Sequence, residues 1–174
     1  MTNFSNRDWF IGFFITVFSQ YSMANSEHEI DKYLAKYPYV YHLVQKTLWD
    51  KTLAENSVYY PPTYNQDKFT HATANPDFLL TIGNHFYTDV EGEWLCLQMS
   101  VNSLATTGVR TIFEGTAPVG DKPADFEGTD SELFPHILGG IHPAAVLKVH
   151  QVSRDSEGRF LTVASVADPD NLQQ

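Results

Sequence analysis

Two histidines of this chain stand inside apolar stretches, where an imidazole ring could hold a bound ligand by hydrogen bonds. His42 lies between Tyr41 and Leu43, and His71 lies within the aromatic and β-branched segment 69–73. Burying a neutral imidazole costs free energy unless both ring nitrogens find partners. Each ring therefore either belongs to a satisfied core or faces a cleft, and for one histidine taken alone the core is the commoner case.

A third stretch combines a carboxylate with an imidazole. Glu132 and His136 flank the sequence Leu-Phe-Pro, whose apolar side chains must be anchored in the core. Such anchoring holds the neighbouring polar groups firmly, which suits a ligand site but also an ordinary turn. These residue types place three candidate site positions along the chain, at 42, at 71 and at 132–136.

The sequence lacks the motifs that usually indicate other kinds of chemistry. The chain has no Gly-x-Gly-x-x-Gly motif, no Walker loop and no Gly-x-Ser-x-Gly elbow, which disfavours Rossmann, P-loop and α/β-hydrolase folds. None of the seven histidines forms a His-x-His or His-x-x-x-His pair on an expected element, so we predict no metal site. The single cysteine, Cys96, excludes an intrachain disulfide and lies in an apolar strand pattern typical of an inert buried thiol.

The elements that must position these residues are short. The polar pattern of residues 27–36 predicts a helix that Pro38 ends, and Thr47 can begin a second helix that stops at Asn56. Asn75-Pro76-Asp77 carries the start signals of a third helix, which should end near residue 87. Seven segments are extended by residue type: 39–44, 58–60, 68–73, 94–99, 110–114, 144–152 and 159–163.

We expect residues 102–104 to form the turn between two of these strands, and 159–163 to pair with 144–152 as a hairpin. Residues 115–131 are rich in glycine, proline and aspartate and predict a long loop, which in other proteins is often a functional lid. Many short strands with two main helices indicate an α+β domain with no doubly wound sheet.

The length and the net charge of the chain limit the number of domains and the kinds of partner to expect. A chain of 174 residues is typical of one domain, and a net charge of −10 disfavours binding to nucleic acid.

The apolar run 9–18 is too short to span a bilayer. Residues 1–24 are therefore interpreted as a signal peptide, an extension upstream of a true start at Met23, or a surface helix. We expect a lead-in at 25–38, one domain at 39–163 and a flexible tail at 164–174. A cytoplasmic location is favoured, with secretion as the alternative if 1–24 is a signal peptide.

Three motifs together resemble a known family. Tyr-His-Leu at 41–43, Phe-Thr-His-Ala-Thr at 69–73 and Glu-Leu-Phe-Pro-His-Ile-Leu-Gly at 132–139, in this order, resemble the uncharacterised family called domain of unknown function 952. The resemblance covers residues 39–152. It implies a fold similar to the ADP-ribosyltransferase superfamily, with a compact split antiparallel sheet and α+β architecture.

The resemblance also implies NAD as a ligand and a role for each motif. By chain order, His42 would hold a ribose hydroxyl or the pyrophosphate, His71 would orient the nicotinamide ribose, and Glu132 would stabilise an oxocarbenium-like state. Glu114, which ends a strand pattern, is the rival for this acidic role. The remaining expected ligand contacts are Thr70, Thr73, Tyr60 and His136.

Three functions stay open at this stage. The first is an NAD-dependent ADP-ribosyl-transferring or NAD-cleaving enzyme, and the second is a non-catalytic module that binds a nucleotide-like ligand in the same cleft. In the third, His42 and His71 are core residues bonded to each other or to Glu132. The sequence differs from the pattern of the ADP-ribosyltransferase superfamily, because no arginine lies between Arg7 and Arg110. A bound diphosphate would therefore rely on histidines, Lys68 or backbone N–H groups. We expect a small-molecule ligand, no nucleic acid and no membrane partner for the domain.

Overall fold

The structure is a computed structural model that describes residues 28–124, 129 and 132–167. The chain divides into two compact units between Lys36 and Tyr37. In the first unit, residues 28–36 are helical, as predicted for the lead-in. The predicted extension at 1–24 and the end of the predicted tail at 168–174 lie outside the described residues. All other elements belong to the second unit.

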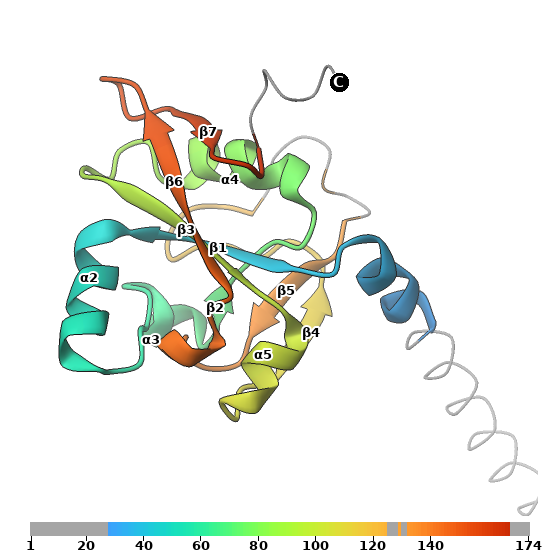
Figure 1. The fold of residues 1–174 in the computed structure, drawn as a ribbon. Helices are drawn as coiled ribbons and strands as arrows, with labels where there is room; N and C mark the ends of the chain where they lie inside the picture. Colours follow the sequence, from blue (N-terminus) through green and yellow to red (C-terminus); the bar gives the residue numbers. More distant parts are fainter. Residues whose placement is uncertain (1–27, 125–128, 130–131, 168–174) are drawn as a thin grey trace, which may run out of the picture. The chain divides into compact units, whose positions relative to one another are not determined.

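The second unit contains a four-stranded antiparallel sheet in the order β1-β3-β6-β7 (Figure 1). The pairing of its edge strand β1 with β3 places His42 opposite Leu97 and Leu43 opposite Cys96. The strands are β1 (Val40–Gln45), β3 (Trp94–Met99), β6 (Lys148–Arg154) and β7 (Phe160–Val163). The predicted hairpin is confirmed, because β6 pairs with β7.

A second, three-stranded antiparallel sheet has the order β2-β5-β4. Its strands are β2 (Thr70–His71), β4 (Thr111–Glu114) and β5 (Phe134–Ile137). The two sheets meet where Tyr41 of β1 exchanges backbone hydrogen bonds with Thr73, just after β2. The architecture is therefore α+β with the antiparallel strands divided between two sheets.

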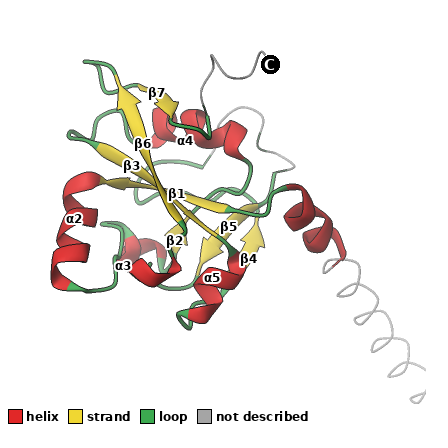
Figure 2. Cartoon of the chain, viewed as in Figure 1, coloured by secondary structure: helices red, strands yellow, loops and turns green. Residues whose placement is uncertain are grey.

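Short helices connect the strands, as Figure 2 shows for the same view. They are α2 (Lys46–Glu55), α3 (Tyr64–Asp67), α4 (Leu79–Phe86) and α5 (Val101–Thr106), with 3-10 turns at η1 (Pro76–Phe78) and η2 (Pro143–Ala145). Of these, α2 and α4 are the two helices that the sequence predicts. Asn75 caps the turn before α4, since its side chain accepts a hydrogen bond from the backbone of Asp77.

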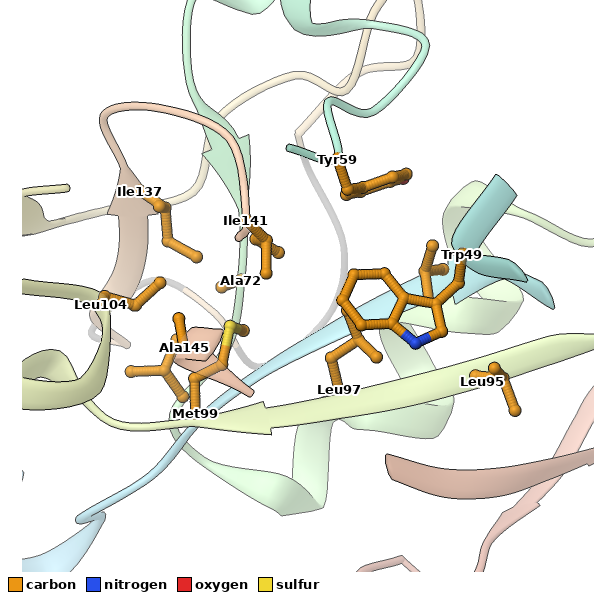
Figure 3. Packing of buried hydrophobic residues seen from close by; sticks show 12 residues of the cluster. Trp49, Tyr59, Ala72, Leu95, Leu97, Met99, Leu104, Ile137, Ile141 and Ala145 are labelled. Carbon is orange, nitrogen blue, oxygen red and sulfur yellow. The ribbon is translucent and has the colours of Figure 1, made fainter. Parts of the chain in front are cut away.

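Strands β1 and β3 are buried on both faces because their side chains alternate between two apolar clusters. Leu95, Leu97 and Met99 enter the first cluster, where Figure 3 shows them beside Trp49 and Ala72. The second cluster lies on the other face and is formed by Tyr41, Leu43, Leu79, Trp94, Cys96, Phe160 and Val163. Cys96 is fully buried, and burial raises the pKa of its thiol, as expected for an inert cysteine.

Several expected elements are wrong in detail. The predicted turn at 102–104 is the middle of helix α5, which begins with a capping box in which Ser100 and Ser103 each accept the other's backbone N–H. The predicted strand at 58–60 is reduced to one bridge between Tyr59 and Ile141. The predicted extended piece at 68–73 is shorter, because α3 ends at Lys68 in a left-handed conformation before β2 begins.

The last predicted strand also starts later than expected. Residues 143–145 form η2, since Pro143 begins a turn capped by the ring of His142, and β6 begins only at Lys148. The first part of the predicted flexible tail has defined contacts. Ala164 accepts a hydrogen bond from the ring of His150, and Ala167 bridges to Val163.

Candidate functional site

A cleft opens where the two sheets meet, and it is lined by three of the histidines that the sequence singles out. It encloses about 50 Å³ of free space, or about 510 Å³ when the open mouth and the gaps between atoms are counted. The described residues that line it are Tyr41, His42, Leu43, His71, Ala72, Thr73, Leu79, Ile82, Phe86, Tyr87, Thr116, Ala117, Val119, Phe134 and His136. Most of these side chains are apolar or aromatic, and none of these described residues is a carboxylate, lysine or arginine. The cleft is thus an apolar pocket with imidazole and hydroxyl groups as its polar parts.

His42 is built into the wall of the cleft by β1. Its Nδ1 lies 2.7 Å from the backbone oxygen of His71, and its Nε2 lies 3.5 Å from the hydroxyl of Tyr59. A carbonyl oxygen only accepts, so Nδ1 of His42 carries the proton and Nε2 faces the hydroxyl. Burial lowers the pKa of His42 to about 4, and the ring is therefore neutral at pH 7. The interpretation of His42 and His71 as core residues bonded to each other is therefore right in part, because the ring of His42 donates to the backbone oxygen of His71.

His71 faces the same cleft from β2 and is held by a carboxylate. Its Nε2 lies 3.0 Å from Oδ2 of Asp67, whose side chain is only 5% exposed. Burial lowers the pKa of His71, and the neighbouring Asp67 carboxylate partly opposes this shift. With Nε2 as the donor to Asp67, Nδ1 is the acceptor nitrogen of a neutral ring.

His136 completes the set from β5. Its ring stacks on Phe69 with the ring centroids 4.0 Å apart, and its Nδ1 lies 3.0 Å from Oε2 of Glu114 on β4. Burial lowers its pKa, while the Glu114 carboxylate opposes the shift. The centroids of the His71 and His136 rings are 6.0 Å apart, so the two imidazoles stand next to each other.

The other predicted site residues have different positions. Thr73 lines the cleft. Thr70 is fully buried and donates its hydroxyl proton to the backbone of Gly139, while Tyr60 is 52% exposed and packs against Tyr64. Neither of them belongs to the described lining of the cleft.

The two acids considered for the site differ in their surroundings. Glu114 contacts the cleft histidine His136, although 60% of its side chain is exposed. Glu132 is half-buried just before β5 and is not among the described residues that line the cleft. It nevertheless precedes Phe134 and His136 by two and four residues, and both of those side chains face the cleft.

Sequence reasoning missed two residues that shape the site. Asp67 is the last residue of α3 and His71 lies in β2, so their contact depends on the left-handed conformation of Lys68 between them. The sequence carries no signal for this conformation, because α3 has only four residues and Lys68 is not a glycine or asparagine. Tyr87, which follows α4, also lines the cleft. Burial is the main cause that raises the pKa of its hydroxyl, and the negative charge of Asp67 adds to this effect.

Comparisons with known proteins define the class of this chain. The family model described as "Protein of unknown function (DUF952)" matches residues 43–149, and the chain belongs to this family. No curated protein matches the sequence.

Among solved structures, the chain is similar to the crystal structure of protein CC0527 from Caulobacter crescentus, a structural genomics target. The TM-score is 0.51 at 15% sequence identity, over 70% of this chain and 92% of that one. A double mutant of the same protein gives a TM-score of 0.49 at 14% identity over the same shares. The likeness to the first structure shows that the two chains share a fold.

Among residues 28–124, 129 and 132–167, no three side chains of His, Cys, Asp or Glu come together as a metal-binding group. The helices in this part of the chain are all too short or too polar to cross a membrane.

Proposed function

We propose that the cleft binds the nicotinamide–ribose end of NAD and that the chain is an NAD-cleaving or ADP-ribosyl-transferring enzyme. The observation that carries this proposal is the convergence of His42, His71 and His136 from β1, β2 and β5 into one apolar cleft. An apolar pocket with a few convergent polar groups is the usual form of a small-ligand site.

The residues present fit one end of the dinucleotide. Tyr41, Phe86 and Tyr87 offer aromatic surface for a flat ring, and the hydroxyl of Thr73 and the imidazoles offer hydrogen bonds for a ribose. The free space in the cleft is far below the roughly 300 Å³ of a typical ligand site, so the rest of NAD would extend through the open mouth.

In the proposed reaction the bond between ribose C1′ and the nicotinamide nitrogen breaks. Its electron pair leaves with nicotinamide, C1′ takes on positive charge, and an acceptor oxygen then bonds to C1′ and gives up its proton. A carboxylate near the ribose would stabilise the charged state. Glu132 is the candidate, because alternation along an extended chain would put it on the same side as Phe134 and His136.

The test is to incubate the full chain with NAD and to follow free nicotinamide together with the melting temperature. We expect the wild-type protein to release nicotinamide and Glu132→Gln to reduce the rate by about 100-fold or more. His71→Ala should also lose activity. Glu157→Gln, on the turn between β6 and β7, is the matched control and should act as the wild type. Equal rates for Glu132→Gln and the wild type would remove Glu132 from the mechanism.

A non-catalytic binding module is the second candidate function. It is favoured by one observation: no carboxylate and no cation stands among the described residues that line the cleft. Such a cleft suits a weakly charged nucleotide-like ligand that is held and not cleaved. NAD or a nucleoside would then raise the melting temperature without any release of nicotinamide. If NAD neither releases nicotinamide nor raises the melting temperature, both the NAD-cleaving enzyme and the NAD-binding module are wrong.

A further inference from the structure

Asp67 makes contacts with two parts of the cleft at once. Its Oδ2 lies 3.0 Å from Nε2 of His71, and both carboxylate oxygens lie 3.2 Å from the backbone nitrogen of Gly120. The side chain is almost fully buried, at 5% exposure. A buried carboxylate must have its oxygens hydrogen-bonded, and here His71 and Gly120 supply the protons.

The first contact decides which nitrogen of His71 carries the proton. A carboxylate only accepts, so Nε2 of His71 must donate, and Nδ1 is left as the basic nitrogen of a ring that lines the cleft. An imidazole fixed in this way by a carboxylate is a better defined proton acceptor than a free ring, since one tautomer is selected.

The second contact fastens a segment over the cleft. Residues 115–124 follow β4, and Thr116, Ala117 and Val119 of this segment line the cleft. Gln66 reinforces the attachment to α3, because its Nε2 lies 2.9 Å from Oδ1 of Asp121. Gly120 itself has φ +57°, which favours glycine, and an added Cβ would lie 3.0 Å from Thr63.

The far side of this segment is attached to α4. The ammonium group of Lys122 donates to the backbone oxygen of Phe86 and pairs with Asp89. The ring of His85 lies 3.0 Å from the backbone oxygen of Pro123. Segment 115–124 therefore crosses from α3 to α4, and Asp67 is its buried attachment at the α3 end.

We propose that Asp67 is a positioning residue that selects the His71 tautomer and, with the same carboxylate, holds segment 115–124 over the cleft. The proposal rests on the proposed function for its kinetic consequence: in that reaction Nδ1 of His71 would take up the proton of the acceptor oxygen, and only the tautomer selected by Asp67 leaves Nδ1 unprotonated. Asp67 does not touch the ligand and acts through His71 and Gly120.

The direct test reads the tautomer by ¹⁵N NMR of the full chain labelled at histidine. In the wild type we expect the proton of His71 on Nε2, with the signals assigned by their loss in His71→Gln. In Asp67→Asn the amide group can donate to Nε2 and still accept from Gly120, so the proton should move to Nδ1. Asp77→Asn, an exposed carboxylate near the start of α4, is the matched control and should leave the tautomer unchanged. A wild-type proton on Nδ1, or the same tautomer in Asp67→Asn, would overturn the proposal.

Hydrogen exchange of segment 115–124 tests the second contact. Asp67→Ala removes the acceptor of Gly120 N–H, so exchange of this segment should speed up about 10-fold or more relative to the wild type and Asp77→Ala. Because Asp67→Ala could lower the stability of the whole domain, exchange in strand β3 serves as the internal reference. Equal acceleration in both places, or none in segment 115–124, would refute the attachment.

Kinetics separates this inference from the proposed function. With NAD as the substrate, Asp67→Asn should lower kcat about 10-fold or more while KM changes less than about 3-fold, because the ligand contacts remain and only the base is misplaced. A change in KM alone would contradict a positioning role. If the wild type releases no nicotinamide, the proposed function fails, whereas the NMR and exchange results still decide the role of Asp67.

Discussion

At the scale of single residues, His42 is a buried polar group that belongs to the fold as well as to the cleft. The residue is 4% exposed, and its Nδ1–H donates to the backbone oxygen of His71. His42→Ala would leave that oxygen without its donor and open a cavity between the sheets. We expect the free energy of unfolding to fall by about 3 kcal/mol, measured by urea denaturation.

The control for this prediction is an exposed histidine of the same chain. His28→Ala should change the free energy of unfolding by less than about 0.5 kcal/mol, as is usual for surface substitutions. A loss below about 1 kcal/mol in His42→Ala would mean that the ring faces ligand and solvent and contributes little to the core.

The low pKa of His42 predicts a dependence of stability on pH. The pKa is about 4 in the folded protein and 6.5 in the reference state, so between these values the unfolded chain binds a proton that the folded chain does not. Stability therefore falls as the pH falls through this window. The lowered pKa values of His71, His136 and His150 act in the same direction.

Urea unfolding at pH 7 and pH 5 measures this effect. We expect the wild type to lose about 2 kcal/mol from His42 alone between these two conditions, and His42→Gln to lose that much less than the wild type. Identical losses in both proteins would show that His42 is not the group that titrates.

At the scale of elements, the contact of α4 with β7 depends on a glycine. A Cβ added at Gly83 would lie 2.6 Å from Cγ of Phe160, and the side chain of Asn84 hydrogen-bonds the backbone of Phe160 in both directions. Gly83→Ala gains about 1 kcal/mol of helix propensity but overpacks this contact, which costs about 1–3 kcal/mol. We expect a net loss of about 1 kcal/mol by thermal or urea unfolding.

Two further variants make this prediction specific. Gly115→Ala has no neighbour within 4 Å of the added Cβ and should leave stability nearly unchanged. Combining Gly83→Ala with Phe160→Leu should cost less than the sum of the two single changes, because a smaller side chain makes room for the methyl group. Strict additivity would show that the ring and the methyl group do not meet.

The same scale shows what the sequence can predict. Residues 94–99 are apolar or aromatic except for Gln98, and strand β3 has these limits. Helix α5 could not be expected, because Val101 and Thr106 have poor helix propensity and the capping box uses Ser103 in place of the usual Glu or Gln. Its start is specified by local hydrogen bonds and by the packing of Leu104, which no periodic pattern reveals.

The candidate site was predictable to a similar extent. His42, His71 and His136 stand out as polar residues in apolar surroundings, and the structure brings them to one cleft. The role of Asp67 could not be predicted, since it depends on the left-handed conformation of Lys68 and on a backbone N–H that is 53 residues away in the chain. Contacts of this kind come from tertiary folding and leave no local pattern.

At the scale of the whole second unit, β1 and β3 carry both apolar clusters. Val44 and Leu97 belong to one cluster and Leu43 and Cys96 to the other, although they alternate along the same two strands. Neither cluster can lose its packing without exposing one face of the shared sheet. The two faces should therefore unfold together in one cooperative transition.

Two tryptophans can test this because each reports on one face. Trp49 belongs to the first cluster and Trp94 to the second. In a chain where Trp9→Phe removes the remaining indole, Trp94→Phe leaves Trp49 as the probe and Trp49→Phe leaves Trp94. To correct for the cost of each substitution, both are compared with far-ultraviolet circular dichroism of the same variant. We expect each fluorescence midpoint to agree with its circular dichroism midpoint within about 0.2 M urea. A tryptophan that reports its transition well before the loss of secondary structure would show that its face of the sheet opens independently.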